Sequence, residues 1–121
     1  MIKISVCDDD EGQLTFFKQC FMEYNEKHKE KIEANFYQSV QSLLNEKKFS
    51  PDVYFLDIEL QDGNGLKLAG KIRTRNSKIP IVFITSHEEF MPEAFHVHAY
   101  QYLNEKKNAQ AVENVLNQLA D

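Results

Sequence analysis

Hydrophobic and polar positions along the chain follow two alternating periods, one of about two residues and one of about 3.6 residues. Short β-rich or wholly apolar runs predict five strands, at residues 2–7, 32–36, 53–56, 81–84 and 99–103. Apolar residues at helical spacing predict five helices, at residues 13–24, 40–44, 66–72, 86–95 and 108–119. Because strands and helices alternate regularly, the pattern predicts an α/β fold in which a doubly wound, five-stranded parallel sheet carries helices on both faces.

Polar residues at the predicted helix starts supply capping signals. Asp10 follows the first strand, and its position favours a role as a helix cap or a solvated loop residue. Ser39 and Asn108 are suited to cap the second and fifth helices. Ser86 with Glu89 three residues later fits a capping box, which would open the fourth helix at that point.

Composition and charge narrow the class of protein. The 121 residues suit a single domain, 1–121, with 42% hydrophobic residues to fill one core. A formal charge of −5 argues against direct nucleic-acid binding, because phosphate contacts need a basic face. The two cysteines form no disulfide framework or zinc motif. No signal-peptide pattern appears, and the longest apolar run, 79–84, is too short to span a membrane. We therefore expect a reduced, soluble, cytoplasmic protein.

Acidic residues gather where two of the predicted strands end. Asp8 and Asp9 follow the first strand, Asp57 follows the third, and Thr85 follows the fourth. In open parallel sheets the carboxyl ends of the strands meet at one edge, where ligands bind. Carboxylates brought together there repel one another, and a hard divalent cation offsets that repulsion. The sequence therefore predicts a Mg²⁺ site formed by these acids.

The segments around the strand ends resemble, in their order along the chain, the receiver (CheY-like) domain of two-component response regulators. The matching segments are Val6–Asp10, Phe55–Leu60, Asp62–Gly65, Ile84–Ser86 and Ala99–Leu103. No single segment is specific, but five in the right order at the right strand ends are, and they cover essentially the whole chain. The resemblance implies the flavodoxin-like (βα)5 fold with strand order 2-1-3-4-5.

Two segments, Leu56–Leu60 and Thr85–Phe90, are most similar to receivers of LytTR-type transcriptional regulators. In that class a DNA-binding domain usually follows the receiver. A length of 121 residues fits one receiver and leaves nothing for an output domain. We therefore expect any DNA binding to belong to sequence outside this chain.

The resemblance assigns chemical roles to the acids. Asp57 is expected to be the phosphoacceptor, whose carboxylate takes a phosphoryl group from a sensor histidine kinase and becomes an acyl phosphate. Asp8 and Asp9 are expected to hold Mg²⁺ together with Asp57, and the backbone carbonyl of Glu59 to supply a further ligand. The metal neutralises charge on the transferring phosphoryl group, which is most of what phosphoryl transfer needs from a protein.

The resemblance also implies a conformational switch. Thr85 is expected to hydrogen-bond a phosphoryl oxygen, although its place in the chain also suits a residue at a helix N-terminus. Tyr102 is expected to be the switch aromatic, although it also suits an ordinary strand residue half buried in the core. In the family the surface of helix 4, strand 5 and helix 5 mediates dimerisation or output contacts, so a homodimer through this surface is a further expectation.

One departure from the family pattern concerns a lysine. The family carries Lys and then Pro three and four residues after the switch aromatic, whereas this chain has Glu105 and Lys106 there. A lysine ammonium pairs with the phosphoryl group and the acceptor acid, whereas a glutamate would add negative charge. Either Lys106, or less readily Lys107, reaches the site through a bulge or shift at the strand end, or the lysine is missing.

Three functions follow from these features. The leading interpretation is a phosphorylation-controlled signalling domain, which is not an enzyme but assists its own phosphorylation and dephosphorylation. The second is a module with constitutive protein contacts, in which Glu105 has disabled the switch. The third is a small Mg²⁺-dependent phosphatase with an aspartyl nucleophile. Asp8 and Asp10 have the spacing of such enzymes, but the chain has no room for their cap domain.

Overall fold

Five parallel strands form the centre of the structure, a computed structural model that describes residues 1–120. The strands of this sheet are β1 (Ile2–Cys7), β2 (Ile32–Tyr37), β3 (Val53–Leu56), β6 (Ile81–Ile84) and β7 (Gln101–Leu103). The helices are α1 (Glu11–Lys27), α2 (Val40–Leu44), α3 (Gly65–Arg75), α4 (Met91–His96) and α5 (Ala109–Ala120). A 3₁₀ turn, η1 (Glu88–Phe90), precedes α4, and a hairpin of β4 (Glu59–Leu60) and β5 (Gly63–Asn64) follows β3.

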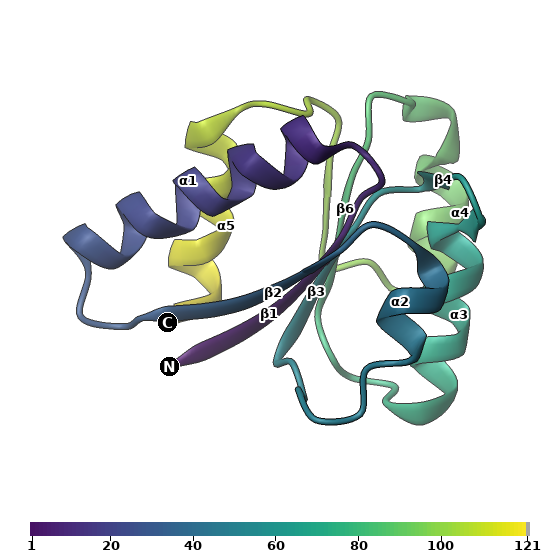
Figure 1. Ribbon diagram of the computed structural model, residues 1–121. Helices are drawn as coiled ribbons and strands as arrows, with labels where there is room; N and C mark the ends of the chain where they lie inside the picture. The colour runs from purple at the N-terminus through teal and green to yellow at the C-terminus, as the bar shows by residue number, and fades with distance from the viewer. Residues whose placement is uncertain (121) are drawn as a thin grey trace.

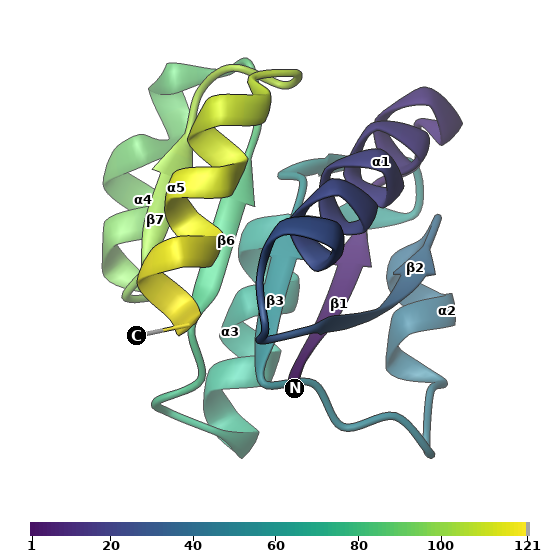
Figure 2. The same ribbon diagram turned by 90° about the vertical axis from the view of Figure 1, so that its left-hand side faces the viewer.

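The strand order is β2-β1-β3-β6-β7, and every neighbouring pair is parallel. Because β6 and β7 are the fourth and fifth strands of this sheet along the chain, the predicted α/β fold and its order are confirmed. Helices α1 and α5 cover one face of the sheet, and α2, α3 and α4 cover the other (Figures 1 and 2). Helices on both faces explain why β6 is apolar and buried along its whole length.

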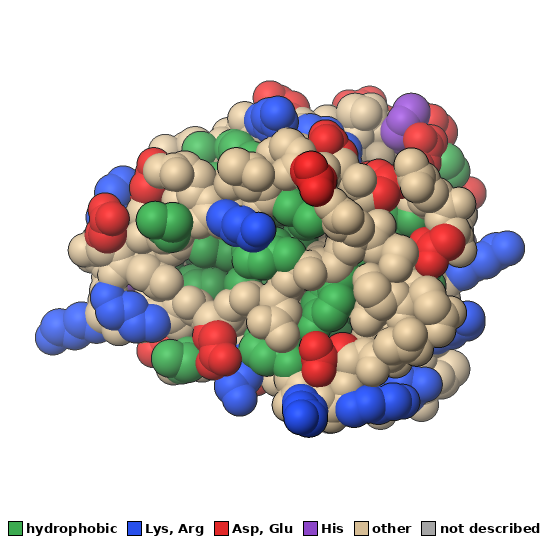
Figure 3. Space-filling model, in the orientation of Figure 1, with side chains coloured by type: hydrophobic (Ala, Val, Ile, Leu, Met, Phe, Trp, Pro, Cys, Tyr) green, Lys and Arg blue, Asp and Glu red, His purple; other side chains and the backbone are tan. Residues whose placement is uncertain are grey.

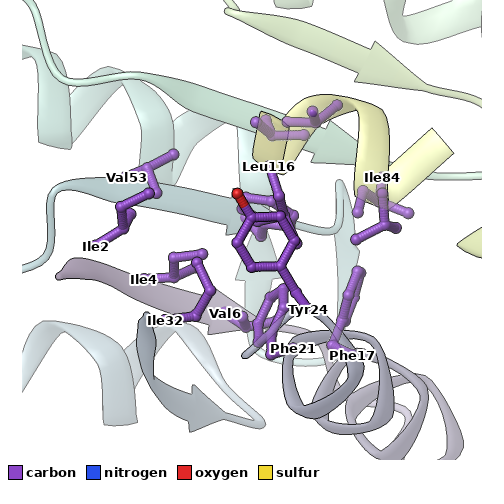
Figure 4. Packing of buried hydrophobic residues seen from close by; sticks show 14 of the residues in the cluster. Ile2, Ile4, Val6, Phe17, Phe21, Tyr24, Ile32, Val53, Ile84 and Leu116 are labelled. Carbon is purple, nitrogen blue, oxygen red and sulfur yellow. The ribbon is translucent and has the colours of Figure 1, made fainter. Parts of the chain in front are cut away.

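The core consists of two apolar clusters, one on each face of the sheet. Between the sheet and α1, the ring of Phe55 meets the rings of Phe17 and Phe21 edge-on, with centroid distances of 5.8 Å. Figure 4 shows Phe17 and Phe21 of α1 in this cluster. Leu116 of α5 closes this cluster. Phe83 belongs to the second cluster, which lies beneath α2, α3 and α4. Full burial of each such side chain stabilises the fold by about 1.5–3 kcal/mol, so the strands are held in a fixed register.

Three of the predicted helix caps are present. The Asp10 side chain accepts a hydrogen bond from the backbone N–H of Gly12 at the start of α1. Ser39 caps α2 through a capping box. Asn108 accepts a hydrogen bond from the backbone N–H of Ala111 and so caps α5. Each side chain satisfies a backbone donor that the first turn of a helix leaves without an intrahelical partner.

The predicted capping box of Ser86 and Glu89 is wrong. The chain enters η1 at Glu88 with no side-chain hydrogen bond from the cap residue, His87, and α4 begins only at Met91. The Glu89 carboxylate lies 3.1 Å from Nδ1 of the His87 imidazole instead. This neighbouring ring competes for the carboxylate that a capping box requires.

The surface carries charges of both signs. On the face seen in Figure 3, Lys and Arg side chains lie among Asp and Glu side chains and form no continuous basic patch.

None of the helices within residues 1–120 combines the length and the apolarity needed to cross a bilayer.

Candidate functional site

Three predicted acids meet at the carboxyl edge of the sheet. Cys7 and Leu56, the last residues of β1 and β3, lie opposite each other, so the residues that follow them are neighbours. The backbone N–H of Asp57 donates to the carbonyl of Cys7 across 3.0 Å, which extends this pairing. One carboxylate oxygen from each of Asp8, Asp9 and Asp57 lies within 4.8 Å of the others.

Asp57 lies at the bottom of this cluster. Its side chain is 8% exposed, and its Oδ1 atom is buried without a hydrogen-bond partner among the described residues. Burial raises the pKa of the Asp57 carboxyl, and Lys106 opposes this rise without cancelling it, while the charge of Asp8 adds to it. A buried carboxylate oxygen without a partner is costly. The atom is therefore available to bind a cation or to form a covalent bond.

Backbone groups orient the other two acids. Asp8 Oδ1 accepts a hydrogen bond of 3.0 Å from the N–H of Asp10, and Asp9 Oδ2 accepts one of 3.0 Å from the N–H of Gln61 beyond β4. The sequence patterns did not single out Gln61, because it acts through its backbone. The acids line an open cavity of about 450 Å³. Its lining residues are Asp8, Asp9, Asp10, Asp57, Glu59, Leu60, Gln61, Thr85, Ser86, His87 and Lys106.

Lys106 is the lysine that reaches the acids. Its Nζ atom lies 2.9 Å from Asp8 Oδ2 and 2.9 Å from Asp57 Oδ2. Burial lowers the pKa of the Lys106 ammonium, but hydrogen bonds and charge from Asp8 and Asp57 outweigh burial, and the net pKa is raised. The ammonium therefore stays charged between the carboxylates. Glu105 and Lys107, on either side, are both exposed.

The arrangement leaves room for a further cation. Three carboxyl groups surround a single ammonium, so acidic groups outnumber basic groups in the cluster. The Asp57 Oδ1 atom adds a buried acceptor that has no hydrogen-bond partner within residues 1–120. Mg²⁺ prefers a site in which a few carboxylates bind it and its other coordination positions are left for water and phosphate oxygens. The residues present thus fit a magnesium ion.

Thr85 and Tyr102 are connected through His87. Thr85 is fully buried, and its Oγ1 atom accepts a hydrogen bond of 3.3 Å from the backbone N–H of His87. The Tyr102 hydroxyl donates to the backbone carbonyl of His87. Tyr102 is partly buried, with its ring 6.4 Å from the ring of Phe83. Both residues therefore contact the same peptide segment at the rim of the cavity.

His87 is a site residue to which the sequence patterns gave no role. Its Nε2 atom lies 3.3 Å from the side chain of Glu59 on β4, and its Nδ1 atom 3.1 Å from Glu89. The imidazole thus bridges the β4–β5 hairpin and the segment after β6. In the sequence, only its position two residues after Thr85 indicated that His87 lies near the site.

Gly65 packs directly behind Asp57. A Cβ atom at this position would lie 2.0 Å from the Asp57 carbonyl oxygen, whereas one at Gly70 in the same helix would meet nothing within 4 Å. We expect Gly65→Ala to lower the free energy of unfolding by about 1–3 kcal/mol, because the backbone that carries Asp57 must move. Gly70→Ala is the matched control and should raise it by about 0.5–1 kcal/mol through helix propensity. Urea unfolding of both variants measures the difference, and equal effects would contradict the close approach.

Sequence comparison places this geometry in a known family. Residues 4–117 match the family described as the response regulator receiver domain. The chain belongs to this family. An uncharacterised response regulatory protein of Yersinia pestis is 29% identical to this receiver domain over 120 residues, 99% of the chain and 49% of that protein. The sensory transduction protein LytR of Staphylococcus saprophyticus is 41% identical over 68 residues, 53% of the chain and 27% of that protein.

The similarity to LytR agrees with the predicted resemblance to receivers of LytTR-type regulators. The receiver domain spans about half, or less, of the length of these curated relatives.

Solved structures share the fold at low sequence identity. The BeF3-activated receiver domain of DrrB superposes with a TM-score of 0.82 at 19% identity, over 98% of this chain and 96% of that one. The response regulator TrrA of Thermotoga maritima, in complex with Mg²⁺ and BeF, gives 0.81 at 22% identity, over 98% and 99%. At these identities the similarity establishes the receiver fold.

Proposed function

We propose that Asp57 of this two-component receiver domain accepts a phosphoryl group from a sensor histidine kinase in the presence of Mg²⁺. The observation that carries the proposal is the position of the Lys106 ammonium, 2.9 Å from both Asp57 and Asp8. A carboxylate that is buried, lacks a partner on one oxygen and faces a fixed cation has the surroundings that phosphoryl transfer requires.

Asp8, Asp9, Asp57 and the backbone carbonyl of Glu59 would hold the Mg²⁺ ion. When bound, the ion supplies positive charge beside the phosphoryl oxygens and orients them. Asp8 and Asp9 keep their carboxylates in place through the backbone N–H groups of Asp10 and Gln61. Their orientation is therefore set by the backbone and does not depend on the metal.

The reaction is a substitution at phosphorus. A carboxylate oxygen of Asp57 forms a bond to phosphorus while the phosphorus–nitrogen bond of the kinase's phosphohistidine breaks. The electron pair of that bond returns to the imidazole nitrogen, which takes up a proton. Lys106 stays charged beside the new acyl phosphate and pairs with a phosphoryl oxygen. The Thr85 hydroxyl turns from the His87 N–H to donate to another phosphoryl oxygen.

This movement of Thr85 would carry the signal to the surface. The His87 backbone N–H then loses its hydrogen bond to Thr85. The hydrogen bond that the His87 carbonyl accepts from the Tyr102 hydroxyl is then free to rearrange. Such a change biases an equilibrium between two existing states. The affected surface comprises α4, β7 and α5, where Phe95 is 81% exposed and Met91 45%. We propose homodimerisation through this surface, which would control a DNA-binding output domain outside this chain.

The proposal predicts a phosphoryl adduct that depends on Mg²⁺. The receiver domain incubated with acetyl phosphate and Mg²⁺ should gain the mass of one phosphoryl group, and the same incubation with EDTA should leave its mass unchanged. Intact-protein mass spectrometry measures both. If no adduct forms at any Mg²⁺ concentration, the phosphoacceptor role fails, and the domain would instead act by constitutive protein contacts.

A further inference from the structure

Gln13 is a buried polar residue for which the proposed chemistry has no role. It lies in the first turn of α1, on the same buried stripe as Phe17, Phe21 and Tyr24, and its side chain is almost fully shielded from solvent. A primary amide in such a place is costly unless it is hydrogen-bonded. A polar residue on the buried stripe of a helix therefore calls for an explanation.

The partner of Gln13 lies at the phosphorylation site. The Gln13 Nε2 atom donates a hydrogen bond to the backbone carbonyl of Lys106, which is 93 residues away in the chain. The ammonium of the same Lys106 bridges Asp8 and Asp57. The amide thus holds the main chain of the residue whose side chain enters the acidic cluster.

Lys106 lies outside the regular secondary structure. The pairing between β6 and β7 ends at Leu103, and α5 begins at Ala109, so Lys106 lies on a turn between the two elements. A proline, which the family carries beside its lysine, is absent from this turn. Since lysine is long and flexible, the direction of its ammonium depends on where its backbone is held.

Gln13 also connects this turn to the acids themselves. It lies three residues after Asp10, whose backbone N–H orients Asp8 and whose carbonyl accepts a hydrogen bond from the Gln13 N–H. The start of α1 therefore sets the position of the Asp8 carboxylate and, through the Gln13 amide, the position of the Lys106 backbone.

We propose that Gln13 is a positioning residue, whose amide holds the Lys106 backbone so that a lysine displaced by one residue pairs with Asp57 and Asp8. The inference rests on the proposed function, because Lys106 matters for phosphorylation only if Asp57 is the acceptor. The proposal adds a residue of α1 to those that support phosphorylation of this receiver domain.

A double-mutant cycle tests the proposal. Gln13→Leu, of similar size and without a donor, should lower the rate of adduct formation from acetyl phosphate and Mg²⁺ by between about three- and tenfold, the equivalent of one hydrogen bond. Gln13→Glu, which replaces the amide donor with a carboxyl group, should lower it at least as much at a pH where that group is ionised. In a Lys106→Met background, Gln13→Leu should have no further effect, because no ammonium remains to be positioned. Gln19→Leu, at an exposed glutamine of the same helix, should change nothing.

A second measurement needs neither metal nor phosphoryl donor. In the metal-free protein, the two ε-methylene protons of Lys106, assigned by their loss in Lys106→Met, should have separate NMR shifts. They should merge in Gln13→Leu and Gln13→Glu, and stay separate in Gln19→Leu.

The outcomes separate this inference from the proposed function. If the unsubstituted protein forms no adduct, the proposed function fails. If the adduct forms and depends on Lys106, but Gln13→Leu and Gln13→Glu keep the original rate and separate shifts, the positioning role alone is refuted. An equal loss of rate from Gln13→Leu with and without Lys106 would also overturn it, since that result indicates general damage to the fold.

Discussion

Asp57→Asn should form no phosphoryl adduct with acetyl phosphate and Mg²⁺, whereas the unsubstituted receiver domain should gain one phosphoryl mass. The physical reason is that a neutral amide has no carboxylate oxygen to attack phosphorus. Asp8 does not take over, because both of its carboxylate oxygens are already paired, one with the Asp10 N–H and one with Lys106, whereas Asp57 Oδ1 has no hydrogen-bond partner among the described residues. Intact-protein mass spectrometry with peptide mapping measures the loss and locates the adduct in the unsubstituted protein.

The Asp57→Asn protein should remain folded. Burial raises the pKa of the Asp57 carboxyl more than Lys106 lowers it, so its negative charge is disfavoured in the native state. Removing that charge should leave the midpoint of urea unfolding unchanged or higher. Glu33→Gln, which removes an exposed carboxylate from β2, is the matched control and should keep the full adduct. An adduct of equal yield in Asp57→Asn would show that another residue is the acceptor.

Lys106→Met should lower the rate of adduct formation by about 10- to 100-fold. A hydrogen bond to a charged group contributes about 1.5–3 kcal/mol, and the Lys106 ammonium is placed to make one with the transferring phosphoryl group. Methionine keeps much of the length of the side chain but lacks the charge. A time course of phosphorylation with acetyl phosphate at fixed Mg²⁺ measures the rate.

The residues on either side of Lys106 provide matched controls. Lys107→Met removes a neighbouring ammonium that is exposed, and it should leave the rate within about twofold, as expected for surface charges. Glu105→Lys should also have a small effect, because the Glu105 side chain is exposed and outside the cavity lining. A large gain of rate in Glu105→Lys would contradict this assignment and would indicate that the native site lacks its lysine.

The elements of this fold could be predicted where the sequence pattern is strong and local. The unbroken apolar run of β6 and the helical spacing of apolar residues in α1 are both visible in the sequence, and both elements are present in the structure. The start of α4 could not be predicted, because it depends on whether Glu89 caps a helix or pairs with the His87 imidazole. Each choice makes one interaction for the same carboxylate, so the surrounding structure decides between them.

In the candidate site, the acids could be predicted from the sequence, but the residues that orient them could not. Asp8, Asp9 and Asp57 follow directly after strands, and strands have a regular geometry that carries their ends to one edge. Gln13 was not singled out from the sequence, because its partner Lys106 lies 93 residues away in the chain. The roles of His87 and of the Gln61 backbone depend on the packing of the β4–β5 hairpin, which is too short to leave a periodic pattern.

By itself, the sequence determined a doubly wound α/β fold with an acidic cluster at the carboxyl edge of its sheet. This was possible because strand and helix periods are local properties, and because parallel strands bring their ends together. Only the tertiary structure decided which residue brings a cation to the acids. Strand alternation ends at Leu103, so the direction of Lys106 is not given by its position in the sequence. It is decided by contacts with Gln13, Asp8 and Asp57, which lie far away along the chain.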